Sequence, residues 1–197
     1  MKPDKIVYIN LDKRTDRNEQ IQAELRAMEL DFERRSGVEH EIGHLGCGLA
    51  HLKVLKEARE QGWESVLILE DDFQFLADKA RVEEGFKAIE DLGPWHVIMF
   101  GYNSLRSQPY NEHFLRILDA QTTSGYMVHS SFYDKLIQLW EESMRDLEKT
   151  HMGHLYALDQ SWKRLQPVNL FYGFSPRLGQ QRESWSDIEK RMVFYGC

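Results

Sequence analysis

Three consecutive acidic residues, Glu70, Asp71 and Asp72, directly follow the apolar segment 66–69. Open parallel sheets bind ligands beyond the carboxyl ends of their strands. Adjacent carboxylates repel one another there unless a cation or hydrogen-bond donors compensate. Mg²⁺ and Mn²⁺ take oxygen ligands, commonly one or two carboxylates together with substrate phosphates. We therefore predict that Glu70 and Asp72, two positions apart, bind Mg²⁺ or Mn²⁺. The alternative interpretation is a solvated acidic turn that caps the next helix.

A second candidate binding segment is basic and lies near the N-terminus. Arg14 and Arg17 are three residues apart and follow the short apolar run 6–9. Guanidinium groups and the N–H groups at a helix start both favour anions, so this spacing suits a diphosphate. The alternative interpretation is a solvated helix start with local ion pairs.

The segment His40-Glu41-Ile42-Gly43-His44 matches the zinc-protease signature H-E-x-x-H. The longer form of that signature needs Gly and His three and six residues after the second His. Those positions hold Cys47 and Ala50 instead. Gly48 and His51 come one residue later than the signature requires. A displacement of one residue rotates a ligand by about 100° around a helix. Glycines also disfavour the helix that the signature requires. These departures argue against a zinc protease.

Hydrophobic periodicity predicts the elements that position these segments. We expect strands at residues 6–9, 32–36, 65–69 and 95–100. We expect helices from residue 15, after a glycine-rich loop at 43–48, and across 82–89. The second half predicts strands at 113–118, 122–128 and 168–172, helices at 130–147 and 155–165, and a polar, loop-like tail from residue 175. This alternation predicts an α/β fold with a mostly parallel central sheet flanked by helices.

Composition narrows the class of protein. A chain of 197 residues has the length of one domain. Its net charge of −7 disfavours nucleic-acid binding, which favours a basic patch. Two cysteines, Cys47 and Cys197, cannot form a disulfide framework, so a reducing compartment is the simpler assumption. No apolar run has the roughly 18 residues that span a bilayer. A cytoplasmic protein without a membrane span is expected.

Six segments, in this order, resemble glycosyltransferase family 25, the lipopolysaccharide-type and collagen-galactosyltransferase-like enzymes. The matching segments are YINLDKRTDR (8–17), LGCGLAH (45–51), VLILEDDF (66–73), SGYMV (124–128), ALD (157–159), and the tail residues 181–182 with 186–188. One departure is Ala50, at a position where the family usually has Ser. The order and spacing of the segments make this resemblance more specific than any one motif.

The resemblance implies a GT-A-type nucleotide-sugar-binding fold, with residues 70–72 in the place of an acidic D-x-D-like metal motif. One glycosyltransferase domain would span residues 1–197. Residues 1–101 would form its nucleotide-sugar-binding half, and residues 102–197 its acceptor-binding half and C-terminal tail. The residues expected to bind the nucleotide sugar are Asn10, Leu11, Arg14, Arg17, Asp71, Gly125, Gln181 and Arg182.

The implied activity is metal-dependent transfer of a hexose from a nucleotide-diphosphate sugar, UDP-hexose, to a hydroxyl of a glycan or other glycoconjugate acceptor, with inversion. An inverting displacement needs a base within reach of the acceptor hydroxyl. We expect this base to be Asp159, where the family has a Pro-Val/Ile-Asp-like motif. The alternative role of Asp159 is a first-turn acid favoured by the helix dipole. The alternative function is a non-catalytic nucleotide-sugar or carbohydrate-binding protein that retains the fold.

Overall fold

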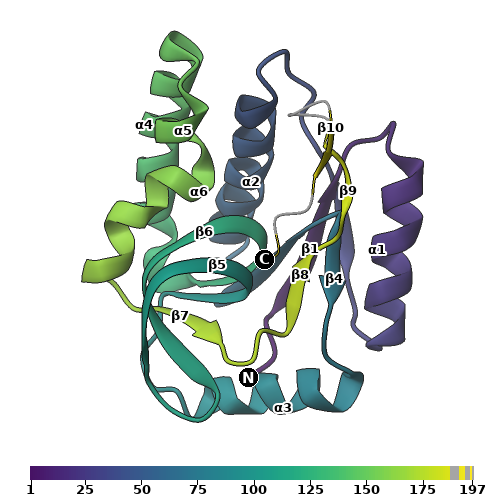
Figure 1. Cartoon of the computed structure of the whole chain (residues 1–197), viewed down its shortest axis with the longest axis vertical. Helices are drawn as coiled ribbons and strands as arrows, with labels where there is room; N and C mark the ends of the chain where they lie inside the picture. The colour runs from purple at the N-terminus through teal and green to yellow at the C-terminus, as the bar shows by residue number, and fades with distance from the viewer. Residues whose placement is uncertain (187–190, 194–195, 197) are drawn as a thin grey trace.

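The computed structural model describes residues 1–186, 191–193 and 196 (Figure 1). Asp187 and Ile188, part of the matched tail motif, lie outside these residues. Six strands form the central sheet in the order β2-β1-β3-β6-β5-β7. They are β1 (Lys5–Asn10), β2 (Glu33–Ser36), β3 (Ser65–Glu70), β5 (Val97–Pro109), β6 (Phe114–His129) and β7 (Phe171–Phe174).

Five of these six strands run in one direction. β1 is parallel to β2 and to β3, and β5 is parallel to β7, whereas β6 is antiparallel to its neighbours β3, β5 and β7. The predicted α/β fold with a mostly parallel central sheet is confirmed.

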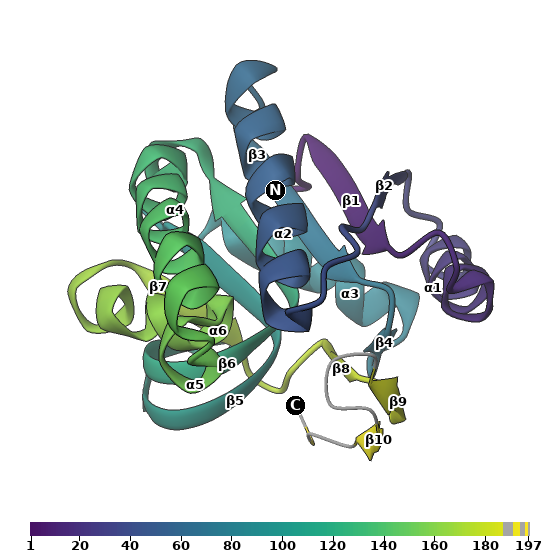
Figure 2. The ribbon, with the colours of Figure 1, turned by 90° about the horizontal axis from the view of Figure 1, so that it is seen from above.

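Helices cover both faces of the sheet. The first face packs against α1 (Thr15–Ala27) and α3 (Lys79–Glu90), and the second against α2 (Gly43–Glu60) and α4 (Tyr133–Thr150). In β3, Leu67 and Leu69 belong to the hydrophobic cluster on the first face, with α1 and α3. Val66 and Ile68 belong to the hydrophobic cluster on the second face, with α2 and α4. A strand buried on both faces reads as a continuous apolar run, which explains the clear signal of this strand in the sequence. Figure 2 shows α2 and α4 side by side.

Two predicted elements differ in extent from those in the structure. Residues 113–118 and 122–128 form one long strand, β6, within which Thr122 has a positive φ of 81°. The helix predicted at 155–165 is divided into α5 (Gly153–Tyr156), α6 (Leu158–Ser161) and the 3₁₀ helix η2 (Trp162–Val168). Another 3₁₀ turn, η1 (Ser130–Phe132), precedes α4.

The glycine-rich segment 43–48 forms the first turns of α2, in place of the loop that its sequence predicts. Close packing explains its glycines. A Cβ atom on Gly46 would lie 2.4 Å from the carbonyl oxygen of Val38, and one on Gly48 would lie 2.0 Å from Sδ of Met144. The start of α2 thus approaches the preceding loop and α4 more closely than other residues would permit.

The tail, expected to be a polar loop, contains short strands. β8 (Gly179–Gln181) pairs with β4 (Phe73–Phe75), and β9 (Ser184–Ser186) pairs with β10 (Arg191–Val193), both antiparallel. The first pairing brings the tail beside the acidic segment that follows β3. Among the described residues, no helix has the length and apolarity required to cross a membrane.

The connections of β1 create a crevice at one edge of the sheet. From β1 the chain passes through α1 to β2 on one side, then returns through α2 to β3 on the other side. Because α1 and α2 lie on opposite faces, the carboxyl ends of β1 and β3 form a topological switch point, where open α/β sheets bind their ligands. Ile9 is paired with Glu70 there, so the ends of the two strands are adjacent.

Candidate functional site

A cavity of about 460 Å³ lies at this switch point. Its lining residues come from the loop after β1, the segment 37–41, the first turns of α2, the acidic residues 70–72 and the end of β8. Seven of the predicted site residues line it: Leu11, Arg14, Arg17, Glu70, Asp71, Asp72 and Gln181. The structure therefore brings together basic and acidic side chains that are more than fifty residues apart in the sequence.

Asp71 is fixed by two donors from the N-terminal segment. Asn10 donates from Nδ2 to one carboxylate oxygen at 2.8 Å, and Arg17 donates from Nη1 to the other at 2.9 Å. Burial raises the pKa of Asp71, and the nearby Arg17 charge opposes that effect. Asn10 is only 1% exposed and does not line the cavity. Its observed contact positions Asp71, and its contact with the nucleotide sugar stays a prediction.

Asp72 is the most perturbed member of the acidic triplet. Its Oδ2 accepts from Gln181 at 3.1 Å and lies 3.0 Å from Nη1 of Arg17. Its Oδ1 is buried and has no hydrogen-bond partner among the described residues. Burial, together with the charge of Glu70, raises the pKa of Asp72 to about 7. A buried carboxylate oxygen without a hydrogen-bond partner is suited to coordinate a cation.

Glu70, the first residue of the acidic triplet, contacts Thr123 and His51. Thr123 donates from Oγ1 to its Oε1 at 2.7 Å, and Nε2 of His51 lies 3.4 Å from the same oxygen. Burial by itself would raise the pKa of Glu70, but the close His51 and the Thr123 hydroxyl outweigh burial and lower it. Glu70 is thus held as a carboxylate.

Arg14 and Arg17 bring two guanidinium groups to the rim of the cavity. Both donate to the backbone carbonyl of Trp185 in β9, at 3.3 and 2.7 Å. Arg14 also forms a two-pronged contact with Asp16, at 3.0 and 2.9 Å, which lowers the pKa of that carboxyl to about 2. The two guanidinium groups therefore converge on one acceptor, as they would on a phosphate oxygen.

Gly125 and Arg182 do not line the cavity. A Cβ atom on Gly125 would lie 2.5 Å from the ring of Phe73, so this glycine makes room for the aromatic ring. Arg182 donates its backbone N–H to the carbonyl oxygen of Asp72 at 2.7 Å, while its side chain donates to Glu24 of α1 at 2.6 Å. The geometry gives both residues a supporting position, and their contact with the nucleotide sugar stays a prediction.

Asp159, the predicted base, lies at the start of α6, outside the lining of the cavity. Its Oδ2 accepts from the backbone N–H of Thr122 at 3.2 Å and from Nε2 of Gln160 at 3.1 Å. Burial raises the pKa of Asp159, and the charge of Glu70 adds to this shift. The two carboxyl groups are therefore near enough to interact.

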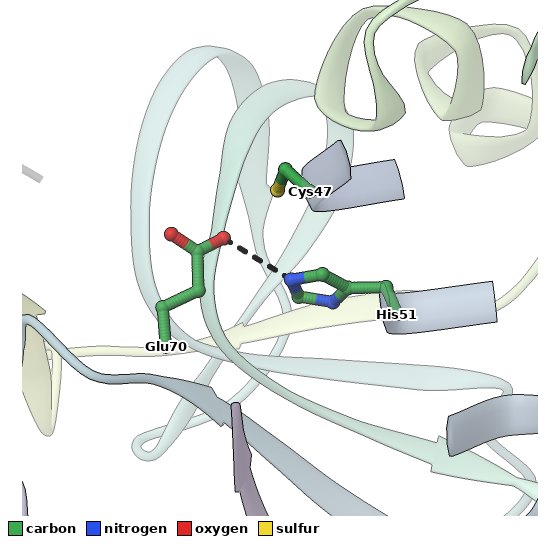
Figure 3. Close-up of side chains that lie close together, drawn as sticks. All are labelled: Cys47, His51 and Glu70. Atoms are coloured by element: carbon green, nitrogen blue, oxygen red, sulfur yellow. Dashed lines mark ion pairs between the residues drawn. The ribbon is translucent and has the colours of Figure 1, made fainter. Parts of the chain in front are cut away.

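Cys47 and His51 are site residues to which the sequence analysis assigned no role. They are one helical turn apart on α2 and face Glu70 (Figure 3). One potential ligand atom from each of these three residues lies within 4.8 Å of the other two. Burial and the surrounding acids raise the pKa of the Cys47 thiol. The available signal was the C-x₃-H spacing, which places two metal-binding side chains on one helix face.

The zinc-protease alternative is not supported by the structure. α2 begins at Gly43, so His40 and Glu41 precede the helix on which the H-E-x-x-H signature depends. Within residues 1–186, 191–193 and 196, the clustered potential metal ligands are Cys47, His51 and Glu70.

No family model matches the chain, and no curated protein matches its sequence. Its fold is similar to that of a mannose-1-phosphate geranyltransferase from Thermus thermophilus, with a TM-score of 0.48 and 11% identity. That match covers 89% of this chain and 58% of the other.

Two further solved structures are similar over more of their length. A glycosyltransferase involved in glycosylation of the major capsid of PBCV-1 has a TM-score of 0.45 and 12% identity, covering 86% of this chain and 91% of that one. The galactosyltransferase LgtC, in complex with donor and acceptor sugar analogs, has a TM-score of 0.44 and 10% identity, covering 94% and 91%. Similarity at this level assigns no activity to this chain, and membership of family 25 stays a prediction.

Proposed function

We propose that this protein is a glycosyltransferase that transfers a hexose from a nucleotide-diphosphate sugar, UDP-hexose, to a hydroxyl of a glycan or glycoconjugate acceptor, with inversion. The observation that carries this proposal is the charge arrangement of the switch-point cavity. Arg14 and Arg17 stand at its rim, and the acidic residues 70–72 lie at the end of β3. Guanidinium groups bind phosphate oxygens, whereas clustered carboxylates bind the divalent cation that accompanies a diphosphate.

The acidic residues fit a Mn²⁺ or Mg²⁺ ion. Glu70 and Asp72 would hold it, and the buried, unpartnered Oδ1 of Asp72 supplies an oxygen that nothing else among the described residues satisfies. When bound, the ion would stabilise negative charge on the leaving diphosphate. Asp71 stays paired with Arg17 and keeps that guanidinium at the cavity.

The donor diphosphate would bind at Arg14 and Arg17. Both guanidinium groups now share the carbonyl oxygen of Trp185, and an anionic phosphate oxygen is a stronger acceptor than a neutral carbonyl. Leu11 lines the same cavity and offers an apolar surface to the nucleoside. Gln181, which donates to Asp72, links this site to the tail.

Asp159 would accept the proton of the acceptor hydroxyl. Burial raises its pKa, which brings its basicity closer to neutral pH, as general-base catalysis favours. Asp159 lies outside the cavity lining, so in this proposal the acceptor would bind on the α6 side of Glu70. The acceptor would therefore approach from a different side than the diphosphate.

A panel of nucleotide sugars, read by thermal shift with and without Mn²⁺, tests donor binding, because a ligand at 100 times its dissociation constant stabilises the native state by about 2.7 kcal/mol. We expect a UDP-hexose to raise the melting temperature when Mn²⁺ is present. Mn²⁺-dependent release of hexose from that donor then tests catalysis. Stabilisation without any release or transfer would support a non-catalytic binding protein. Absence of stabilisation by every nucleotide sugar would overturn the proposal.

A further inference from the structure

Three different types of metal ligand lie close together in the lining of the cavity: the side chains of Cys47, His51 and Glu70 (Figure 3). Nε2 of His51 lies 3.4 Å from Oε1 of Glu70. Nitrogen and oxygen ligands of a tetrahedral zinc ion, each bonded at about 2.0–2.2 Å, are also separated by about 3.4 Å. We propose that these three residues form a Zn²⁺ site with its fourth position open to the cavity.

His51 shows the strongest sign of a missing ligand. The residue is 1% exposed, and its Nε2, which lies 3.4 Å from Oε1 of Glu70, makes no hydrogen bond with any described residue. A buried polar atom without a partner is costly, and a bound metal ion is one of its ordinary explanations. The other ring nitrogen, Nδ1, lies 2.8 Å from the hydroxyl of Tyr126. If Nδ1 carries the proton and donates to Tyr126, the lone pair of Nε2 is directed at the metal position.

The same three residue types could instead form a thiol protease-like catalytic triad. In a triad, the carboxylate bonds one ring nitrogen and the nucleophile contacts the other. Here, Glu70 approaches Nε2, while Nδ1 is occupied by Tyr126. Figure 3 shows the Cys47 sulfur on the Nε2 side of the ring as well. Convergence of both groups on one nitrogen is the arrangement of a metal site.

The ligand set selects the metal. Thiolate and imidazole suit Zn²⁺, whereas Mg²⁺ and Mn²⁺ favour oxygen ligands. Zinc sites with three protein ligands keep a fourth position for water or a substrate atom. All three residues line the switch-point cavity, so that position faces the space available to a ligand. Thr123 and Tyr126 would hold Glu70 and His51 in place as hydrogen-bonding partners of the ligands.

This site does not depend on the proposed glycosyltransferase activity. Glu70 is shared with the proposed Mn²⁺ site, and Figure 3 shows one of its carboxylate oxygens directed at His51 and the other directed away. Cys47 and His51 belong to the zinc site alone, and Asp72 belongs to the manganese site alone. Variants at these positions therefore separate the two proposals.

The test uses the full chain, freed of metal and titrated with Co²⁺, a spectroscopic substitute for Zn²⁺. We expect one equivalent of Co²⁺ to produce a thiolate-to-cobalt absorption band in the near ultraviolet, which Zn²⁺ then displaces. Cys47→Ser should abolish the band and weaken Zn²⁺ binding by more than the roughly 10–100-fold loss that follows removal of a ligand's hydrogen-bonding partner. Cys197→Ser is the matched control, since Cys47 and Cys197 are the two cysteines of the chain.

His51→Gln should also lower Zn²⁺ affinity. The control is His44→Gln, which should leave Zn²⁺ affinity unchanged, because His44 lies on the same helix but outside the cluster. Circular dichroism confirms that each variant is folded. Absence of the band in the parent protein, or its persistence in Cys47→Ser, would overturn the zinc site. Asp72→Asn should keep the band while losing Mn²⁺-dependent donor binding. If no nucleotide sugar binds but the band is present, only the glycosyltransferase proposal fails.

Discussion

The guanidinium of Arg17 is joined to the carboxylate of Asp71 across 2.9 Å, and the two side chains are only 11% and 10% exposed. This pair connects α1 to the end of β3, across the point where the sheet reverses its strand order. Removing one partner of a buried ion pair leaves an uncompensated charge. Loss of either partner should therefore destabilise the fold and change the charge of the cavity.

Arg17→Met should lower the free energy of unfolding by about 3–5 kcal/mol, the usual cost of breaking a buried ion pair from one side. Urea denaturation of the metal-free protein measures this change. Lys13→Met is the control, because Lys13 forms a 3.4 Å ion pair with Glu39 in which both side chains are more than half exposed. Such a pair contributes less than about 1 kcal/mol. Equal losses in the two variants would contradict a special role for Arg17.

Asp72→Asn should abolish Mn²⁺-dependent binding of the nucleotide sugar while the fold is retained. In the absence of metal the variant should be more stable than the parent at pH 8, because burial and the Glu70 charge disfavour ionised Asp72. Calorimetry of donor binding with and without Mn²⁺ gives the first result, and thermal denaturation in a chelator gives the second. Glu39→Gln, another carboxylate of the cavity, should keep the metal dependence.

The acidic site was predictable because its position follows from local pattern. A strand buried on both faces gives the apolar run 66–69, and the residues directly after it must lie at the carboxyl end of the sheet. The role of Asn10 was not predictable in this way. Its contact with Asp71 depends on β1 lying beside β3, a pairing between segments sixty residues apart.

Tertiary packing also makes the segment 43–48 helical, against the low helix propensity of its glycines. Glycine disfavours helices, so the segment 43–48 was expected to be a loop. Its helical conformation is explained by the close approach of Gly46 to Val38 and of Gly48 to Met144, which no local pattern contains. The same helix carries Cys47 and His51. With 43–48 expected to be a loop, their spacing predicted no shared helix face, and only the packed structure places Glu70 opposite them.

Arg14→Ala should weaken donor binding by about tenfold or more, since a hydrogen bond to a charged group contributes roughly 1.5–3 kcal/mol. Affinity for the acceptor should change far less, because Arg14 lies at the rim where the diphosphate is proposed to bind. Titration calorimetry with each ligand compares the two effects. Arg26→Ala, in the last turn of α1, the helix that directly follows Arg14, is the control. Unchanged donor affinity in Arg14→Ala would remove this residue from the site.

Gly125→Ala distinguishes packing from ligand contact at this position. The added methyl group would lie 2.5 Å from the Phe73 ring, and overpacking of a core costs about 1–3 kcal/mol. We expect a lower melting temperature together with an unchanged dissociation constant for the donor, measured well below that temperature. A weaker donor interaction without loss of stability would support the ligand contact predicted from the sequence.

Asp159→Asn tests the base. Donor binding should survive in this variant, because Asp159 lies outside the cavity lining, while transfer to the acceptor should fall by roughly 10²–10⁴-fold, the range for general-base catalysis. The base must be ionised to act, so the rate of the parent enzyme should decline as the pH falls through the pKa of Asp159. Since burial raises that pKa, the decline should begin above the usual range of an aspartate.

Asp119→Asn is the control for this variant, because Asp119 is a carboxylate of the same region that pairs with Lys163 at 3.7 Å. It should transfer sugar at close to the parent rate and keep the acidic limb of the pH profile. Asp159 also accepts the backbone N–H of Thr122, a bond that the amide oxygen of Asn can still accept. A purely structural Asp159 would therefore tolerate the change. Transfer by Asp159→Asn at near the parent rate would show that another group deprotonates the acceptor.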